Sequence, residues 1–213
     1  MSRNFIFFIG ILGVALFAIP AILGGFLIED YSVLRQYISE SYAVDTQYGP
    51  YLRILGYIPS GLLLTLFCFA TPRHLAPSKA VSIGFGGIAI FYGLATVIVG
   101  IFPCDSGCNR ALIDPSLSHL IHTLTGGLTY LLVPLFMMLV GIGLKMTKHP
   151  NVFGLRSIVL GVIAFLGAFV LLSNPDATYI GLYQRLVEPV FLIWFLACAW
   201  FIKQEPSPNN PKS

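Results

Sequence analysis

The sequence predicts an all-α fold: a polytopic membrane protein built as a bundle of six transmembrane helices. Of its 213 residues, 56% are hydrophobic and only 10% are charged, whereas soluble domains carry about 25% charged residues. The mean hydropathy of +0.84 points the same way. This composition excludes a soluble enzyme and a disordered chain, and the net charge of +3 is too small to mark a nucleic-acid partner.

Six apolar segments are long enough to cross a bilayer, since about 20 helical residues span its hydrocarbon core. They cover residues 5–28, 51–70, 81–102, 117–144, 157–173 and 180–202. Each is expected to be helical, because lipid offers no hydrogen-bond partner to backbone amides. Residues 1–203 are therefore predicted to form one transmembrane domain, and residues 204–213, rich in Pro and Asn, a disordered cytoplasmic tail.

The loops predict the orientation. Eight of the twelve basic residues lie on the side that holds both termini, and eight of the nine acidic residues lie on the other side. Because short cytoplasmic loops collect Lys and Arg, we expect a multi-pass protein of the cell inner membrane with both termini in the cytoplasm. The loops 29–50, 103–116 and 174–179 then face out. Residues 31–39 are mildly amphipathic and are expected to form a short helix on the membrane surface.

The third segment carries small residues at helical spacing. Gly86, Gly93 and Gly100 are seven residues apart, which is two helical turns, so they are expected to share one face. Small faces let helix backbones approach closely in lipid. We therefore expect this helix to be buried against a neighbour.

Two cysteines follow the third segment. Cys104 and Cys108 flank Asp-Ser-Gly, a turn-forming tripeptide that brings them within disulfide distance. In an oxidising compartment they are expected to form a disulfide. Metal ligation and redox chemistry are the alternatives, although redox pairs usually read Cys-x-x-Cys.

Two histidines open the fourth segment. His119 and His122 are three residues apart and share a helix face, and Gly126 leaves room one turn deeper. One interpretation is structural, with both rings hydrogen-bonded to neighbouring helices. Another is a metal site for Zn, completed by Asp105 or Glu188, since zinc takes three or four protein ligands. Acid–base chemistry or ligand binding is the third.

Polar groups also gather at the outer ends of the second and sixth segments. Arg53 and Tyr57 are four residues apart on one face. Glu188 needs a partner inside the bilayer: Arg185, three residues earlier in the sixth segment, is expected to form an ion pair with it, and His119, His122 or Arg53 are the alternatives across the bundle. Pro189 suits a helix start, which predicts that the helix begins near Glu188.

These groups lie at one depth, which predicts an outward-facing polar pocket. The candidate ligand-binding residues are Arg53, Tyr57, Asp105, His119, His122, Gln184, Arg185 and Glu188.

Three short motifs carry a resemblance. They are Phe-Pro-Cys-Asp-Ser-Gly-Cys at 102–108, Ser-His-Leu-Ile-His at 118–122 and Gly-Leu-Tyr-Gln-Arg at 181–185. With them the chain resembles a bacterial family of six-span membrane proteins, the domain of unknown function 998. The resemblance covers nearly the whole chain and implies a six-helix integral membrane protein, but it implies no activity.

Three functions fit these observations. In the first, the pocket binds a membrane lipid head group or a small solute, and Arg53 and Arg185 hold its phosphate or carboxylate. In the second, the protein is a metal-dependent hydrolase acting on a lipid, with zinc on His119, His122, Asp105 and Glu188. The third is a transporter, although the six spans lack evident inverted repeats.

Overall fold

The computed structural model describes residues 1–147 and 152–204. It contains six helices long and apolar enough to cross a membrane, and no strand among the described residues. They are α1 (Arg3–Leu27), the spans Gly49–His74 and Lys79–Ile101, α6 (Leu117–Lys145), α7 (Val152–Ser173) and α8 (Ile180–Gln204). The predicted fold class is confirmed. The predicted tail lies outside the described residues from position 205 onward.

The second and third spans each contain a π-helical turn. The second consists of α2 (Gly49–Leu52), the π turn η2 (Arg53–Tyr57), α3 (Ile58–Ala70) and the 3₁₀ turn η3 (Thr71–His74). The third consists of α4 (Lys79–Ile88), the π turn η4 (Ala89–Leu94) and α5 (Ala95–Ile101). A π turn shifts the helix register and is frequent at functional sites.

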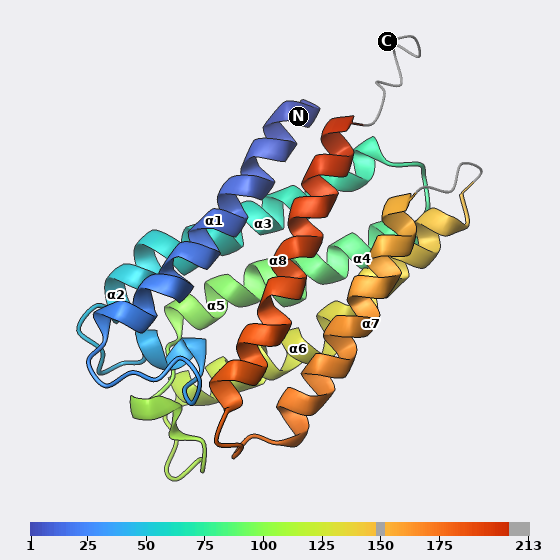
Figure 1. Cartoon of the computed structure of the whole chain (residues 1–213). Coiled ribbons are helices and arrows are strands. Elements are labelled where there is room, and N and C mark those ends of the chain that lie inside the picture. The colour runs from blue at the N-terminus through green and yellow to red at the C-terminus, as the bar shows by residue number, and fades with distance from the viewer. Residues whose placement is uncertain (148–151, 205–213) are drawn as a thin grey trace.

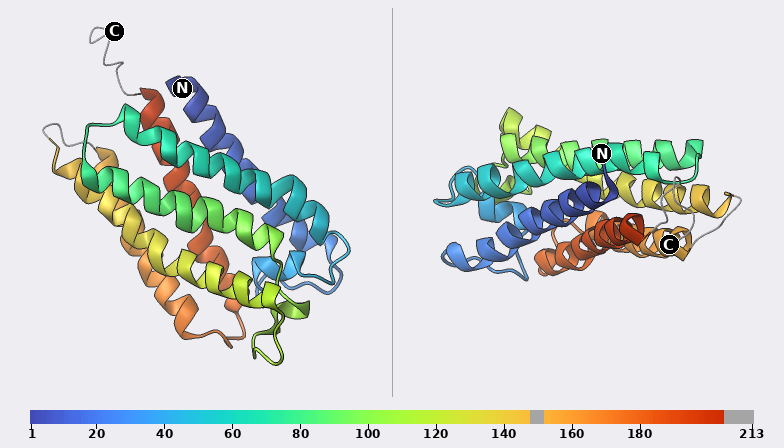
Figure 2. Two further views of the ribbon diagram at one scale, coloured as in Figure 1. Left: turned by 180° about the vertical axis from the view of Figure 1, so that it is seen from behind. Right: turned by 90° about the horizontal axis from the view of Figure 1, so that it is seen from above.

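The helices form a closed ring in which neighbours in sequence pack side by side, and α8 returns to pack against α1. Figures 1 and 2 show two layers, one holding α1, α8 and α7 and the other holding α3, α4, α5 and α6. The start of α1 and the end of α8 lie together at what we call the terminal end (Figure 1). We call the opposite end, which holds the loops 28–48, 102–116 and 174–179, the disulfide end.

Aromatic side chains fill the space between the layers. Trp194 of α8 is fully buried and contacts the rings of Phe85, Phe153 and Phe195. Its indole N–H donates to the Ser157 hydroxyl at 2.9 Å, so the polar atom of this side chain has a partner inside the apolar core. This cluster holds α4, α7 and α8 together toward the terminal end.

The expected glycine face is only partly correct. Gly93 and Gly100 lie against Thr65 and Ile58 of the second span, but a Cβ on Gly86 would have nothing within 4 Å. The physical reason is η4, which begins after Gly86 and includes Gly93, and whose wider turn rotates the rest of the span out of the seven-residue repeat.

The loop after α1 does not form the surface helix expected at residues 31–39. The loop, residues 28–48, folds inward and contains the 3₁₀ turn η1 (Ile38–Tyr42), in which Ile38 and Tyr42 are buried. Arg185 holds this loop in place, because its guanidinium donates to the carbonyl of Val33 at 2.7 Å and to that of Gln36 at 2.9 Å. The loop therefore covers the disulfide end as a cap.

The alternative start of the last helix near Glu188 is wrong, whereas the start at residue 180 of the predicted segment is confirmed. The helix α8 begins at Ile180 and continues through Pro189. A proline inside a helix removes one backbone hydrogen bond. The first turn of α8 is held by its contact with the cap, since the Leu182 N–H donates to the Leu34 carbonyl at 3.0 Å.

Candidate ligand-binding cavity

A cavity of about 410 Å³ lies inside the disulfide end of the bundle. Its walls come from α1, η4, α5, the first half of α6, the end of α7, the first turns of α8, the cap and the loop 102–116. Four of the predicted site residues line it, namely His119, His122, Gln184 and Glu188. The other four, Arg53, Tyr57, Asp105 and Arg185, do not line it.

Glu188 lies in the cavity wall with 4% of its surface exposed. Its carboxylate accepts a hydrogen bond from the Tyr92 hydroxyl at 2.5 Å and another from the Tyr130 hydroxyl at 2.7 Å. Gln184 donates to the Tyr130 oxygen at 2.9 Å and accepts from the Ile38 N–H at 2.6 Å. A continuous hydrogen-bond chain therefore joins the cap to the carboxylate through α8 and α6.

The expected ion pair between Arg185 and Glu188 does not form. Arg185 points away from the carboxylate and binds the cap, including the Tyr31 hydroxyl at 2.7 Å. Within residues 1–147 and 152–204, the ion pair present joins Arg110 to Glu40 at 2.7 Å. Helical spacing predicted the pair because Arg185 and Glu188 are three residues apart. The guanidinium binds the cap instead, because the cap offers it several hydrogen-bond acceptors.

Both histidines are buried at the start of α6, with 1% of His119 and 8% of His122 exposed. The Asp105 N–H donates to His119 Nδ1 at 3.3 Å, so His119 Nε2 carries the proton and faces the Thr123 hydroxyl at 3.3 Å. His122 Nδ1 donates to the Phe102 carbonyl at 2.9 Å. One nitrogen of each ring thus fastens α6 to the loop that precedes it.

Gly126 lies one turn below His122, and a Cβ there would have nothing within 4 Å. The same holds for Gly127, and both glycines line the cavity. The room expected beside the histidines is therefore present.

The sulfur atoms of Cys104 and Cys108 are bonded, with their Cα atoms 4.9 Å apart. The backbone between them turns through left-handed conformations at Gly107 (φ 60°) and Cys108 (φ 49°), the region that glycine adopts most readily. Cys108 lines the cavity, and its sulfur lies 3.3 Å from the Ser39 hydroxyl of the cap. The disulfide therefore braces the wall of the cavity where the cap meets the loop.

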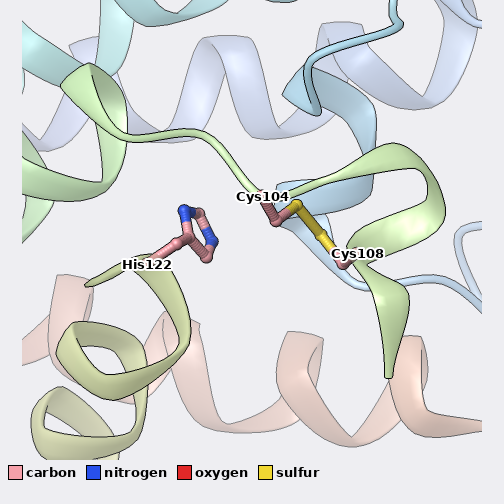
Figure 3. Close-up of side chains that lie close together, drawn as sticks. All are labelled: Cys104, Cys108 and His122. Atoms are coloured by element: carbon pink, nitrogen blue, oxygen red, sulfur yellow. A yellow bond between two sulfur atoms is a disulfide. The ribbon is translucent and has the colours of Figure 1, made fainter. Parts of the chain in front are cut away.

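His122 lies beside the disulfide (Figure 3). Its ring nitrogen and the two sulfurs lie within 4.8 Å of one another, a grouping that could hold a metal ion. This set shares only His122 with the predicted ligands His119, His122, Asp105 and Glu188, which are not gathered as one such group in the part of the chain that the structure describes. With both sulfurs in a disulfide, metal binding at this set first needs reduction to two thiolates.

Arg53 and Tyr57, also predicted for the site, make their contacts outside the cavity. Arg53 donates to the Gly49 carbonyl of its own helix at 3.3 Å. Tyr57 is buried, with its ring against Phe17 and Tyr42, and its hydroxyl has no hydrogen-bond partner among the described residues. Burial raises the pKa of Tyr42, which lines the cavity, so its hydroxyl stays protonated at neutral pH.

Asp105 stabilises the start of α6. Its carboxylate accepts from the Ser116 hydroxyl at 2.5 Å and from the Ser116 N–H at 3.0 Å. These hydrogen bonds lower the pKa of Asp105, because they favour its charged form. Asp105 is therefore a structural residue of the loop and α6.

Sequence reasoning missed three residues of the site. Tyr130 continues the face of His119, His122 and Gly126 by one more turn, so its helical spacing could have identified it. Tyr92 reaches Glu188 from within η4, where the helix register changes, and no spacing in the sequence marks it. The third, the loop residue Arg110, reaches the cavity by a tertiary contact with Glu40.

The fold defines a multi-pass membrane protein, and the six helices enclose a largely apolar cavity with a few polar side chains at one end. The chain belongs to the family described as protein of unknown function (DUF998), whose model matches residues 11–201 and so includes parts of all six spans. The family expected from the three short motifs is confirmed. No curated protein and no solved structure matches this chain.

Proposed function

We propose that this protein binds a lipid head group or a small solute in the cavity at the disulfide end. The observation that carries the proposal is a cavity of about 410 Å³ with a buried, hydrogen-bonded carboxylate in its wall. Ligand pockets are typically ~300–1,000 Å³ with mostly apolar walls and a few convergent polar groups. Ionisable side chains at membrane depth are costly and usually mark a ligand or ion pathway.

The proposal places the cavity on the outer side of the cell inner membrane. Eight of the twelve basic residues belong to the terminal end, which favours a cytoplasmic location for that end. The bond between Cys104 and Cys108 favours an oxidising compartment for the other end.

The proposal does not include an arginine clamp. Arg185 donates to the cap, and Arg53 donates to a carbonyl of its own helix. Neither guanidinium lines the cavity. The polar groups in the cavity wall include those of Glu188, its tyrosine and glutamine partners and the two histidines, together with Arg110, whose guanidinium is already paired with Glu40.

Gly126 supplies the test. Because a Cβ on Gly126 would have nothing within 4 Å and Gly126 lines the cavity, Gly126→Phe is expected to place an aromatic ring in the cavity. Gly86→Phe is the matched control, since Gly86 is also a helical glycine with nothing within 4 Å and lies outside the cavity.

Native mass spectrometry after mild extraction would measure the bound mass. We expect the wild type and Gly86→Phe to carry the same small molecule or lipid and Gly126→Phe to lose it. Equal retention by all three proteins, or no bound mass in any of them on addition of total membrane lipid, would contradict the proposal.

A metal-dependent hydrolase is the second candidate, favoured by the grouping of Cys104, Cys108 and His122. Two thiolates and one imidazole form a known catalytic zinc set that leaves a position open for water. The test is the zinc content of the reduced protein. One zinc per chain that is lost in His122→Ala would favour this function, whereas no zinc in the reduced wild type would exclude a zinc-dependent mechanism there.

A further inference from the structure

The direction of each hydrogen bond around Glu188 can be assigned from the chain that ends on it. The Ile38 N–H can only donate, so Gln184 presents its oxygen there and its NH₂ group to Tyr130. The Tyr130 oxygen therefore accepts from Gln184, and its single proton goes to Glu188. Glu188 is thus an acceptor at the end of this chain, which fits an ionised carboxylate.

The charge of this carboxylate has no opposite charge as a partner in the part of the chain that the structure describes. Within residues 1–147 and 152–204, no Lys, Arg or His nitrogen forms an ion pair with Glu188. A carboxylate has about four lone-pair positions, of which the hydroxyls of Tyr92 and Tyr130 occupy two. A buried charge is costly unless it is paired, so the open positions favour a positively charged ligand.

The walls near Glu188 are aromatic. Tyr92 and Tyr130 touch the carboxylate, and Tyr42 and Phe17 also line the cavity, with the ring of Phe17 5.9 Å from that of Tyr92. Aromatic faces attract organic cations such as quaternary ammonium groups. A hard metal ion is a poorer fit, because it takes about six oxygen ligands and the tyrosine protons here point at the carboxylate.

The charged residues around the cavity, like Glu188 itself, make the disulfide end negative. Apart from Glu188, the helix ends and loops of the disulfide end carry seven acidic and four basic residues, a net charge of −3. Arg110 lines the cavity, but its guanidinium is engaged by Glu40 and by the Arg35 carbonyl at 2.9 Å. A negative surface around a cavity raises the local concentration of cations and repels anions.

We propose that the ligand of this cavity carries an ammonium group and that Glu188 is its counter-charge. This inference rests on the proposed function and adds the class of ligand to it. Such a group is present both in free amines such as choline and in the head groups of phosphatidylcholine and phosphatidylethanolamine. The chemistry at Glu188 is the same for both sources.

Thermal melting of the purified protein in dodecyl maltoside tests the free amines, because a ligand that binds the folded state raises the melting temperature. The probes are choline, ethanolamine and 3,3-dimethyl-1-butanol, which is a neutral isostere of choline. We expect at least one of the amines to stabilise the wild type and the isostere to have no effect. We expect Glu188→Gln to bind the amine at least roughly 30-fold more weakly, the factor expected on removing one charge of a buried pair.

Native mass spectrometry with equal amounts of phosphatidylethanolamine, phosphatidylcholine and phosphatidylglycerol tests the lipid source. Preferential binding of a lipid with an ammonium group, lost in Glu188→Gln, supports a lipid ligand. Stabilisation by free amines without lipid preference supports a small solute. If neither the amines nor the ammonium lipids bind the wild type better than the isostere or phosphatidylglycerol, the inference is overturned.

Two variants separate this inference from the proposed function. If Gly126→Phe loses the ligand while Glu188→Gln keeps it at full affinity, the cavity binds a ligand but the ammonium inference is wrong. If Gly126→Phe keeps the ligand, the proposed function itself fails. Should Glu188→Gln not fold, the comparison of choline with its isostere on the wild type still decides the role of charge.

Discussion

The two halves of α6 use glycine in opposite ways. Toward the terminal end, a Cβ on Gly141 would lie 2.5 Å from the Gly154 carbonyl oxygen of α7, and one on Gly143 would lie 2.9 Å from the Val81 nitrogen of α4. Toward the disulfide end, a Cβ on Gly126 or Gly127 would meet nothing within 4 Å. One half of the helix is thus packed backbone against backbone, and the other half borders a cavity.

The buried acidic and histidine side chains lie in the disulfide half of the bundle. The carboxylate of Glu188, its tyrosine partners and both histidines lie in the disulfide half, whereas the terminal half is closed by an aromatic cluster around Trp194. Tight packing and open cavity space are therefore separated along the bundle. The terminal half holds the helices together, so the disulfide half can leave space and bury polar groups.

The largest effect expected from this comparison concerns the glycines. Gly141→Ala forces α6 away from α7, because its Cβ overlaps the backbone of Gly154 and the side chain of Ile158. We expect a loss of about 2–3 kcal/mol in the free energy of unfolding. Gly126→Ala should instead gain up to about 1 kcal/mol, since alanine favours the helix and has room there. Thermal melting in detergent measures the change in stability of each variant. Equal changes for Gly141→Ala and Gly126→Ala would contradict the difference between the two halves of α6.

A smaller effect is expected for the disulfide. Replacing both Cys104 and Cys108 by serine should lower the free energy of unfolding by about 2 kcal/mol, a modest loss because the closed loop is short. The change should also weaken ligand binding, since Cys108 lines the cavity beside Ser39. Mass spectrometry of thiol-labelled protein provides the control. Labelling of Cys104 and Cys108 in intact cells without a reductant would show that the bond is not formed.

Two tyrosines give a matched pair with a still smaller effect. Tyr130→Phe removes the hydroxyl that links Gln184 to Glu188. We expect it to lower the free energy of unfolding by about 1.5 kcal/mol. Tyr57→Phe removes a buried hydroxyl that has no partner among the described residues, so it should be neutral or slightly stabilising. Melting temperatures of the two variants measure the difference. Equal destabilisation would mean that the hydroxyl of Tyr57 has a bonding role as large as that of Tyr130.

The smallest effect is a dependence on acid pH. The hydrogen bonds from Ser116 hold the pKa of Asp105 below its ordinary value of 3.8. Asp105 therefore stabilises the folded state above that value, and the stabilisation is lost as the pH falls through the lowered pKa of the folded protein. Asp105→Asn should flatten this part of the melting curve against pH, whereas Asp114→Asn, an exposed position in the same loop, should not. Identical acid profiles for Asp105→Asn and the wild type would contradict this role.

Much of the fold could be predicted because hydrophobic length identifies membrane spans directly. The helix bounds differ from the predicted segments by at most five residues. The pairing of His119 and His122 with the open space at Gly126 also followed from helical spacing, since all three lie on one uninterrupted helix. These predictions needed no tertiary contact.

The partners of the site residues could not be predicted, because they depend on how the chain folds over the bundle. Arg185 was expected to bind Glu188 three residues away, yet the cap brings it the carbonyls of Val33 and Gln36. The π turn η4 places Tyr92 within hydrogen-bond distance of Glu188, and the spacing of residues in the sequence does not indicate this contact. The contacts of Arg185 and Tyr92 are both tertiary, and local sequence periodicity does not predict tertiary contacts.

The most direct measurement is an electron-density map of the protein crystallised with the molecule that copurifies from its own membrane. The account predicts density in the cavity, between the aromatic walls, with a polar or charged atom within hydrogen-bond distance of the Glu188 carboxylate. A map in which the copurified molecule lies outside the cavity, or occupies it without approaching Glu188, would contradict the account.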